Sequence, residues 1–270
     1  MRHPFFDLPT PWVIGHRGAS GELPENTLPA FERALGQGAV VLETDVHRTR
    51  DGVVVLAHDP DVARTTEAEG PIAGLAFGEL RRLDAGYRFS PDGGRSHPAR
   101  DRGLRIASLR EAFEALPGVR FNIEIKQNDP ELIAETLRAV EDAGRAELTL
   151  LAAAEDDTMA ALRAALDARG TATAQGASVG DVVGFLRAAG SSAPPPAEPM
   201  ALQVPPSFGG RPLVTAELVE FAHRHDVAVH VWTVNEVDEM DRLLTLGVDG
   251  VMSDFPGRLA EVVARRFAAA

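Results

Sequence analysis

The chain alternates between short apolar runs and longer segments in which apolar residues recur every three or four positions. The short runs have the length of buried β-strands, and the longer segments have the period of amphipathic helices. Eight runs are expected to form strands, at residues 12–15, 40–45, 120–125, 148–152, 171–174, 201–204, 228–233 and 250–253. Eight segments are expected to form helices, at residues 27–36, 109–116, 130–143, 156–168, 179–189, 215–225, 237–246 and 256–267. Eight strand–helix repeats predict an α/β fold, a closed (β/α)₈ TIM barrel, rather than an open sheet.

One segment interrupts the alternation after the second predicted strand. Arg50-Asp51-Gly52 is a turn signal, and the apolar run at 53–57 follows it too closely for a helical crossover, so the pattern predicts a β-hairpin. Residues from about 59 to 105 then carry turn residues, several charges and one weak helix. We interpret this stretch as an insertion that covers the barrel mouth.

The rest of the chain shows no division into domains. The proline-rich run at 191–199 is typical of a polyproline-like loop rather than a domain boundary, and no internal repeat is present. A length of 270 residues is within the usual range for one barrel and is enough to bury a substantial core. We therefore expect a single domain over residues 1–270.

Composition narrows the classes of protein to which the chain can belong. It contains no cysteine, which excludes structural disulfides and cysteine-ligated metal centres. A net charge of −13, from 40 acidic and 27 basic residues, makes it a poor nucleic-acid binder, and an anionic substrate would need a bound cation and local Arg or Lys. No apolar run has the length of a signal-peptide core or a membrane span, so we expect a cytoplasmic protein without stable membrane insertion.

Carboxylates gather at the ends of predicted strands, the edge at which such barrels carry their active sites. Glu43 and Asp45 end the second strand, and Glu124 and Lys126 lie at the third. Residues two apart in a strand point to the same face, so three carboxylates and one ammonium group are expected to converge in the barrel. One divalent cation held by oxygen ligands, Mg²⁺ or Ca²⁺ or else Mn²⁺ rather than zinc, would offset their charge. Interior ion pairs with Arg17 and Lys126 explain the pattern about equally well.

Two histidines leave strands beside this cluster. His16 follows the apolar part of the first strand, and His58 follows the hairpin strand. Two imidazoles next to carboxylates are better explained as a general acid and a general base than as structural residues. We place His47 on the opposite face from Asp45 and interpret it as structural.

Two further residues end strands at the same predicted edge. Trp232 can form an apolar wall for a small substrate, and ordinary packing of the barrel rim explains it nearly as well. Gln203 can hydrogen-bond a substrate or anchor a loop, and the sequence does not favour either.

Several short motifs occur in a defined order along the chain. The first group comprises Gly15-His16-Arg17-Gly18-Ala19-Ser20, Pro24-Glu25-Asn26-Thr27, Glu43-Thr44-Asp45-Val46, Asp51-Gly52 and Val55-Leu56-Ala57-His58-Asp59. The second comprises Arg64-Thr65-Thr66, Ile123-Glu124-Ile125-Lys126, Trp232-Thr233-Val234-Asn235 and the run 247–256. In this order they resemble the signature of glycerophosphodiester phosphodiesterases over nearly the whole chain, with a poor match only at about 170–199.

The resemblance implies a TIM barrel with a small insertion after the second strand. It also implies metal-dependent hydrolysis of a small glycerophosphodiester to glycerol 3-phosphate and an alcohol. The residues that it assigns are metal ligands at Glu43, Asp45 and Glu124, an acid/base pair at His16 and His58, and phosphate contacts from Arg17 and Lys126. We favour His16 as the base and His58 as the acid, with water or a neighbouring substrate hydroxyl as the nucleophile.

Two departures from the family pattern bear on head-group recognition. Ala107-Ser108-Leu109 stands where many members have Pro-Thr-Leu, and Ala152-Ala153-Ala154 stands where a Ser-Phe pair is common. The nearest competing function is that of a lysophospholipase D-like phosphodiesterase with the same core and an apolar channel. A catalytically inactive metabolite-binding barrel and a purely structural or interaction protein belong to different functional classes and compete less well. Neither the head group, the metal nor the oligomeric state follows from the sequence.

Overall fold

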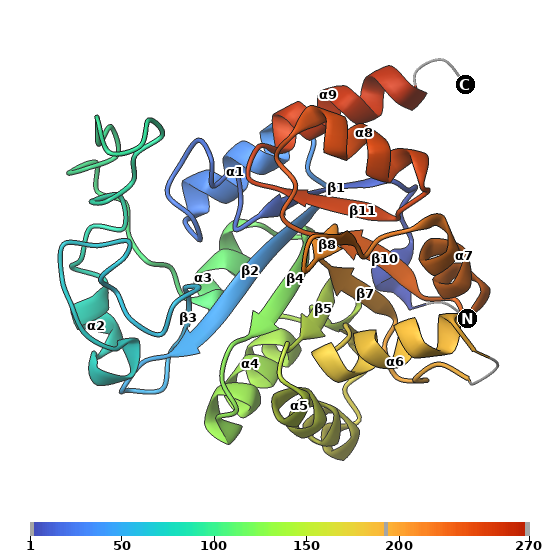
Figure 1. Ribbon diagram of the computed structural model, residues 1–270. Coiled ribbons are helices and arrows are strands. Elements are labelled where there is room, and N and C mark those ends of the chain that lie inside the picture. The colour runs from blue at the N-terminus through green and yellow to red at the C-terminus, as the bar shows by residue number, and fades with distance from the viewer. Residues whose placement is uncertain (1–2, 192–193, 268–270) are drawn as a thin grey trace.

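The computed structural model describes residues 3–191 and 194–267, and eight parallel strands form its barrel. Hydrogen bonds join them in the order β6-β5-β4-β2-β1-β11-β10-β7, and a bridge between Gly176 and Ala201 connects the two ends. Their bounds are β1 Trp12–His16, β2 Val41–Arg48, β4 Arg120–Ile125, β5 Thr149–Ala152, β6 Ala174–Gln175, β7 Ala201–Val204, β10 Ala228–Val231 and β11 Gly250–Ser253. Figure 1 shows the strands inside a ring of helices. The predicted (β/α)₈ TIM barrel is confirmed.

A helix follows each barrel strand and packs on the outside of the sheet (Figure 1). The bounds are α1 Leu28–Gly36, α3 Leu109–Ala115, α4 Pro130–Asp142, α5 Asp156–Arg169, α6 Val179–Ala189, α7 Ala216–Arg224, α8 Val237–Thr245 and α9 Pro256–Phe267. Several begin at a Ser or Thr whose side chain accepts a hydrogen bond from the first turn, as Ser108 does from the backbone N–H of Glu111. Such a cap stabilises a helix by about 1 kcal/mol.

The barrel interior has an apolar floor at the amino ends of the strands. Along β1, Trp12 and Ile14 point into the barrel, whereas Val13 packs outward against the helices. The floor consists of inward side chains from seven strands and two from the N-terminal 3₁₀ turn Pro4–Phe6: Trp12, Ile14, Val41, Leu150, Ala152, Ala174, Ala201, Ala228, Met252, Phe5 and Phe6. The rings of Phe5 and Phe6 lie 5.7 and 5.9 Å from that of Trp12. The floor closes this end of the barrel.

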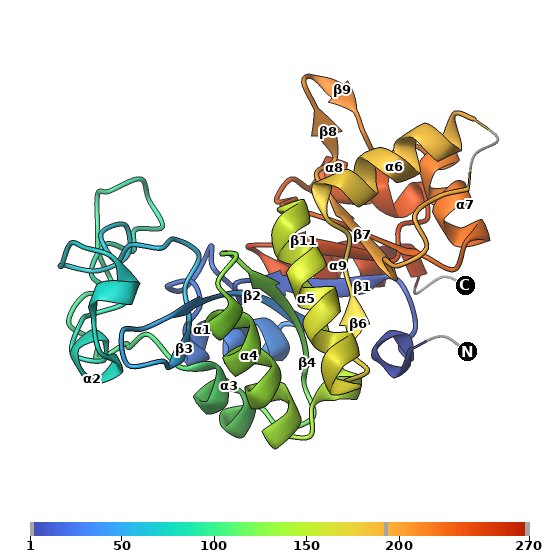
Figure 2. The same ribbon diagram turned by 90° about the horizontal axis from the view of Figure 1, so that it is seen from below.

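The predicted hairpin after β2 is present as β3, Val54–Leu56, which pairs antiparallel with the end of β2. Beyond it, residues 59–105 contain the 3₁₀ turn Ile72–Gly74 and the short helix α2, Phe77–Leu80. Together with Val55 on β3 and Ile106, this segment forms an apolar cluster that includes Val62, Ile72, Leu80 and Ala85. Figure 2 shows it beside the barrel, on the side of β2 and β3.

The structure departs from the predicted elements in two places. The sixth strand begins at Ala174 rather than at residue 171, because Gly170 ends α5 in the left-handed conformation and Thr171 donates back to the Leu166 carbonyl. A hairpin that the pattern did not predict follows β7: β8, Ser207–Phe208, and β9, Arg211–Pro212, are joined by two glycines of positive φ. Figure 2 shows it projecting from the barrel.

Two sequence-based expectations are tested only in part by the described residues. Residues 192 and 193 of the loop expected at 191–199 lie outside them, and the rest of that loop is neither helix nor strand. Across 3–191 and 194–267, no helix has both the length and the apolar character that crossing a membrane requires.

Candidate active site

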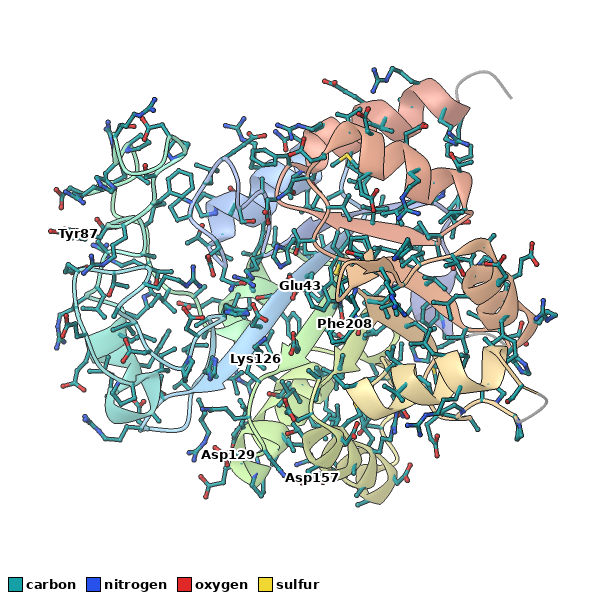
Figure 3. All side chains as sticks on the ribbon, in the orientation of Figure 1. Glu43, Tyr87, Lys126, Asp129, Asp157 and Phe208 are labelled. Carbon is teal, nitrogen blue, oxygen red and sulfur yellow. The ribbon has the colours of Figure 1, made fainter. Side chains whose placement is uncertain are left out.

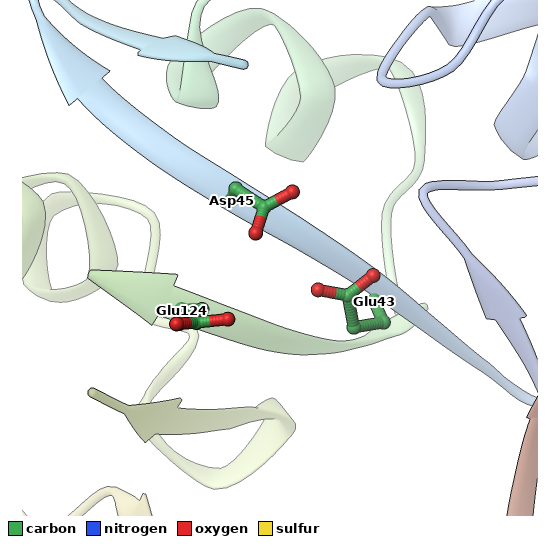
Figure 4. Close-up of side chains that lie close together, drawn as sticks. All are labelled: Glu43, Asp45 and Glu124. Atoms are coloured by element: carbon green, nitrogen blue, oxygen red, sulfur yellow. The ribbon is translucent and has the colours of Figure 1, made fainter. Parts of the chain in front are cut away.

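Three carboxylates, which we call the carboxylate triad, meet inside the barrel above the apolar floor. Glu43 and Asp45 lie on β2 and Glu124 lies on β4, and one oxygen of each is within 4.8 Å of the other two (Figure 4). Glu43 and Asp45 are buried, at 6% and 1% exposed. The period of two along a strand brings them to one face, as expected.

Burial makes the charge of the triad costly. Burial itself, and then the charge of Asp45, raise the pKa of Glu43 to about 8. The oxygen of Glu43 accepts a hydrogen bond from the backbone N–H of Arg17, 3.0 Å away. A divalent ion that accepts oxygen ligands fits this donor set, because it would supply the positive charge that lets all three carboxylates ionise.

The two cations expected in the site also contact the triad. Arg17 Nε lies 3.4 Å from Asp45 Oδ2, and Lys126 Nζ lies 3.4 Å from Asp45 Oδ1 and 3.1 Å from Glu124 Oε1. Although burial opposes it, Asp45 and Glu124 raise the pKa of Lys126. The interior ion pairs that the sequence also allowed are therefore present. They put two positive charges against three carboxylates, which leaves room for a further cation.

Each of the two expected catalytic histidines is held by a carboxylate through the same ring nitrogen. His16 Nδ1 lies 2.6 Å from Asp254 Oδ1, and His58 Nδ1 lies 2.6 Å from Asp59 Oδ1. A carboxylate at Nδ1 keeps the proton on that nitrogen and leaves Nε2 to exchange a proton with another molecule.

The hydrogen bonds to Asp254 stabilise its ionised form beside His16. Asn235 Nδ2 and the Ser20 hydroxyl both donate to it, at 2.7 Å each. Burial opposes ionisation, but the contacts with His16, Asn235 and Ser20 lower the pKa of Asp254 to about 2. Burial likewise opposes protonation of His16, and the hydrogen bond with Asp254 raises its pKa.

The histidine partners were missed by reasoning from the sequence, although signals for them exist. Asp59 is adjacent to His58 in the chain. In the register of β1 with β11, Gly15 pairs with Ser253, so His16 and Asp254 are the next residues at the same edge. That pairing follows only once the barrel is closed, because 238 residues separate His16 from Asp254.

A chain of ion pairs links the loop after β1 to the segment after β3. Arg17 Nη1 donates to Glu25 Oε1 at 3.1 Å, and Arg64 Nη1 donates to Glu25 Oε2 at 2.6 Å. Arg64 also donates to Asp59, the partner of His58. Arg17 and His58 are therefore held relative to each other through Glu25, Arg64 and Asp59.

Two other polar residues, His47 and Asn26, contact residues of the site. His47 does not lie on the opposite face from Asp45: residues two apart share a face, and His47 Nε2 is 3.1 Å from the His58 carbonyl oxygen. Asn26 directly precedes α1 but does not cap it, because Thr27 is the cap. The side chain of Asn26 accepts a hydrogen bond from Thr44 at 2.7 Å and donates to Asp45 at 3.4 Å.

All nine site residues expected from the sequence line one cavity of about 280 Å³ at the carboxyl ends of the strands: His16, Arg17, Glu43, Asp45, His58, Glu124, Lys126, Gln203 and Trp232. The view in Figure 3 places the labelled Glu43 and Lys126 near the centre of the barrel. The cavity lining also includes apolar side chains, namely four alanines at 152–154 and 177, Met252 and the half-exposed Trp232. Gln203 packs so closely on Gly176 that a Cβ there would lie 2.4 Å from its Oε1.

Known proteins match this chain over almost its full length. The sequence model of the glycerophosphoryl diester phosphodiesterase family matches residues 16–258. A glycerophosphodiester phosphodiesterase of Caldanaerobacter subterraneus subsp. tengcongensis is 31% identical, over 93% of this chain and 97% of that protein. Lysophospholipase D GDPD1 of Homo sapiens is 28% identical, over 92% of this chain and 84% of that protein.

Solved structures match in the same way. A putative glycerophosphoryl diester phosphodiesterase from Silicibacter pomeroyi superposes with a TM-score of 0.79 at 26% identity, covering 98% of both chains. An Oleispira antarctica phosphodiesterase, solved in complex with the product sn-glycerol-3-phosphate, superposes with a TM-score of 0.75 at 25% identity, covering 94% of this chain and 96% of that one.

Proposed function

We propose a mechanism for this site from the premise that the chain belongs to the glycerophosphoryl diester phosphodiesterase family. The protein is a phosphodiesterase that hydrolyses glycerophosphodiesters to glycerol 3-phosphate and an alcohol. The observation that carries the mechanism is the pair of His–Asp contacts at Nδ1, made by two histidines that line the same cavity as the carboxylate triad.

Phosphate binding is assigned to the charged side of the cavity. Glu43, Asp45 and Glu124 would hold a divalent ion, which would supply positive charge to the phosphodiester. Arg17 presents a planar fork of N–H donors to a phosphoryl oxygen, and Lys126 adds a point charge. Both cations already contact the triad, so a bound phosphate would lie among positive and negative groups that alternate.

Proton transfer is assigned to the two histidines. Nε2 of His16 takes the proton of the attacking hydroxyl as its oxygen bonds to phosphorus. That hydroxyl belongs to water or to the neighbouring carbon of the glycerol moiety, and in the second case water then opens the cyclic phosphate to glycerol 3-phosphate. Nε2 of His58 gives its proton to the oxygen of the departing alcohol, so that no free alkoxide leaves. The side chain of His58 is 32% exposed and that of His16 is 15% exposed, which supports His58 as the acid because the variable alcohol departs towards solvent.

The proposed activity is tested by measuring glycerol 3-phosphate release from a panel of glycerophosphodiesters. Metal-stripped enzyme receives Mg²⁺, Ca²⁺ or Mn²⁺ separately, and we expect activity only with an added ion and most with Mg²⁺ or Ca²⁺. Full activity after exhaustive chelation would reject the metal-dependent mechanism. Absence of release from every diester with every ion would reject the substrate class.

A lysophospholipase D-like activity is the second candidate. The four alanines at 152–154 and 177 favour it, because these small apolar side chains leave room in the cavity for an acyl group. A lysophospholipid in the same panel tests it: release of lysophosphatidic or cyclic phosphatidic acid at a rate comparable to the diesters supports this candidate, and no release rejects it.

Three further assignments complete the proposal. We propose that residues 59–105 are an insertion into one barrel domain, since they contribute to a separate apolar cluster and contact the site through Asp59 and Arg64. We also propose a cytoplasmic location, which secretion of the native protein from its source would contradict. We propose a small-molecule glycerophosphodiester as the partner, and no nucleic acid.

A further inference from the structure

Asn122 and the three residues of the carboxylate triad form two neighbouring pairs on β2 and β4. In the register of β2 with β4, Glu43 pairs with Asn122 and Asp45 pairs with Glu124. Neighbours in register on parallel strands point the same way, and so do residues two apart on one strand. Asn122 therefore shares the inward face of the triad, and it lines the same cavity.

The amide oxygen of Asn122 is buried without a partner. Asn122 is 4% exposed, and its Oδ1 has no hydrogen bond within the described part of the chain. A buried acceptor left unsatisfied costs about 1–3 kcal/mol, and most such groups in folded proteins are paired. Asn122 lines the same cavity as three carboxylates, which need positive charge nearby. A cation, or a water bound to it, would satisfy both the unpaired Oδ1 and the carboxylates.

We propose that Asn122 belongs to the divalent-metal site and supplies its Oδ1 as a fourth, neutral protein oxygen, an inference that rests on the proposed function. Amide oxygens are accepted ligands of Mg²⁺ and Ca²⁺. A fourth carboxylate at position 122 would add another negative charge beside three carboxylates, two of them buried. An amide gives the ion another oxygen and adds no charge, whether it contacts the ion itself or a water bound to it.

The test compares metal affinity rather than turnover. Metal-stripped wild-type protein and Asn122→Leu, which removes the oxygen at similar side-chain volume, are titrated with Mg²⁺ and with Ca²⁺ by calorimetry and by the shift in Tm. We expect Asn122→Leu to bind each ion roughly 10–100-fold more weakly, with a correspondingly smaller metal-induced Tm shift. Asn122→Asp, which restores an oxygen, should regain the metal-induced shift and lower the metal-free Tm.

A matched control is Thr149→Val on β5. Thr149 is also fully buried with an unpaired oxygen, but its register partner is the outward-facing Phe121, and it does not line the cavity. Removing its hydroxyl should leave the metal affinity unchanged.

Equal metal affinity in wild-type and Asn122→Leu would overturn the inference and leave the carboxylate site standing. Should Asn122→Leu not fold, Asn122→Ala gives the same comparison. A wild-type protein that binds neither ion would instead overturn the metal site of the proposed function, so the two failures are distinguishable.

Discussion

The two ends of the barrel interior are lined by inward-pointing side chains of the same strands, yet their chemistry is opposite. At the amino ends, Trp12 is 1% exposed and packed among phenylalanines and aliphatic side chains. At the carboxyl ends, Trp232, the other tryptophan of the chain, is 42% exposed beside charged groups. On β1 the inward positions change from Trp12 and Ile14 to His16 within one strand. The amino end stabilises the fold, and the carboxyl end holds groups whose burial costs stability but allows chemistry.

Histidine–carboxylate pairs allow the same comparison between equivalent groups. His16 contacts Asp254 just beyond the carboxyl end of β11, and His223 contacts Asp249 just before its amino end, at 2.6 and 2.8 Å. The pairs share their chemistry, but His16 lines the cavity, whereas His223 lies on α7 at the outside of the barrel. Position in the barrel, rather than the pair itself, should decide which one affects catalysis.

The largest expected effect comes from removing a histidine at the carboxyl end. His16→Ala or His58→Ala should lower kcat by about 10²–10⁴-fold, because each loses a positioned proton donor or acceptor. His223→Ala is the matched control and should retain the wild-type kcat. The measurement is glycerol 3-phosphate release with saturating metal, alongside circular dichroism to check the fold. Near-normal turnover in His16→Ala or His58→Ala would contradict the acid/base assignment.

The two tryptophans should respond in opposite ways. Trp12→Ala should lower the free energy of unfolding by about 3–5 kcal/mol, because it empties the centre of a close-packed floor. Trp232→Ala should lower it far less, since its ring is half exposed, and should instead raise KM if the ring contacts substrate. Urea unfolding with metal removed and steady-state kinetics separate the two effects. Equal losses of stability in both variants would contradict the division between floor and mouth.

Much of this division could be predicted from the sequence, since it depends on local patterns. Strand and helix positions followed from hydrophobic periodicity, and the meeting of Glu43 with Asp45 followed from the period of two. The remainder depends on contacts between distant segments. Asp254 becomes a partner of His16 only when β11 pairs with β1, and Arg64 reaches Glu25 only when residues 59–105 fold back onto the barrel. The hairpin β8–β9 was missed despite its Gly209-Gly210 turn signal, because each of its strands has two residues.

A pH-dependent test probes the cost of the buried triad. In metal-free protein, the folded state holds the proton of Glu43 up to about pH 8, whereas the unfolded chain releases it near the ordinary value of 4.5. Since the folded state then binds more protons than the unfolded state, wild-type stability should fall as pH rises between these values. Glu43→Gln cannot ionise, so its advantage in Tm over wild type should grow from pH 5 to pH 8 and then level off. A constant difference across this range would contradict the raised pKa of Glu43.

The smallest expected effect concerns the ion pairs that connect residues 59–105 to the mouth. Arg64 contacts both Glu25 and Asp59, so Arg64→Ala should loosen the Asp59–His58 contact and the Glu25–Arg17 contact together. We expect kcat/KM to fall roughly fivefold, equivalent to about 1 kcal/mol, because the pairs of Arg64 are partly exposed.

The control for Arg64 lies in the same part of the molecule. Arg50 makes an exposed ion pair with Glu79, at 2.8 Å, that has no link to either histidine. Arg50→Ala should therefore match wild type in kcat/KM. Arg64→Lys, which keeps the charge but loses the fork, should recover only part of the rate. If Arg50→Ala and Arg64→Ala lose the same activity, the effect is general loosening of residues 59–105. A loss confined to Arg64 would show that the carboxyl end, unlike the apolar floor, depends on a segment outside the barrel to position its histidine.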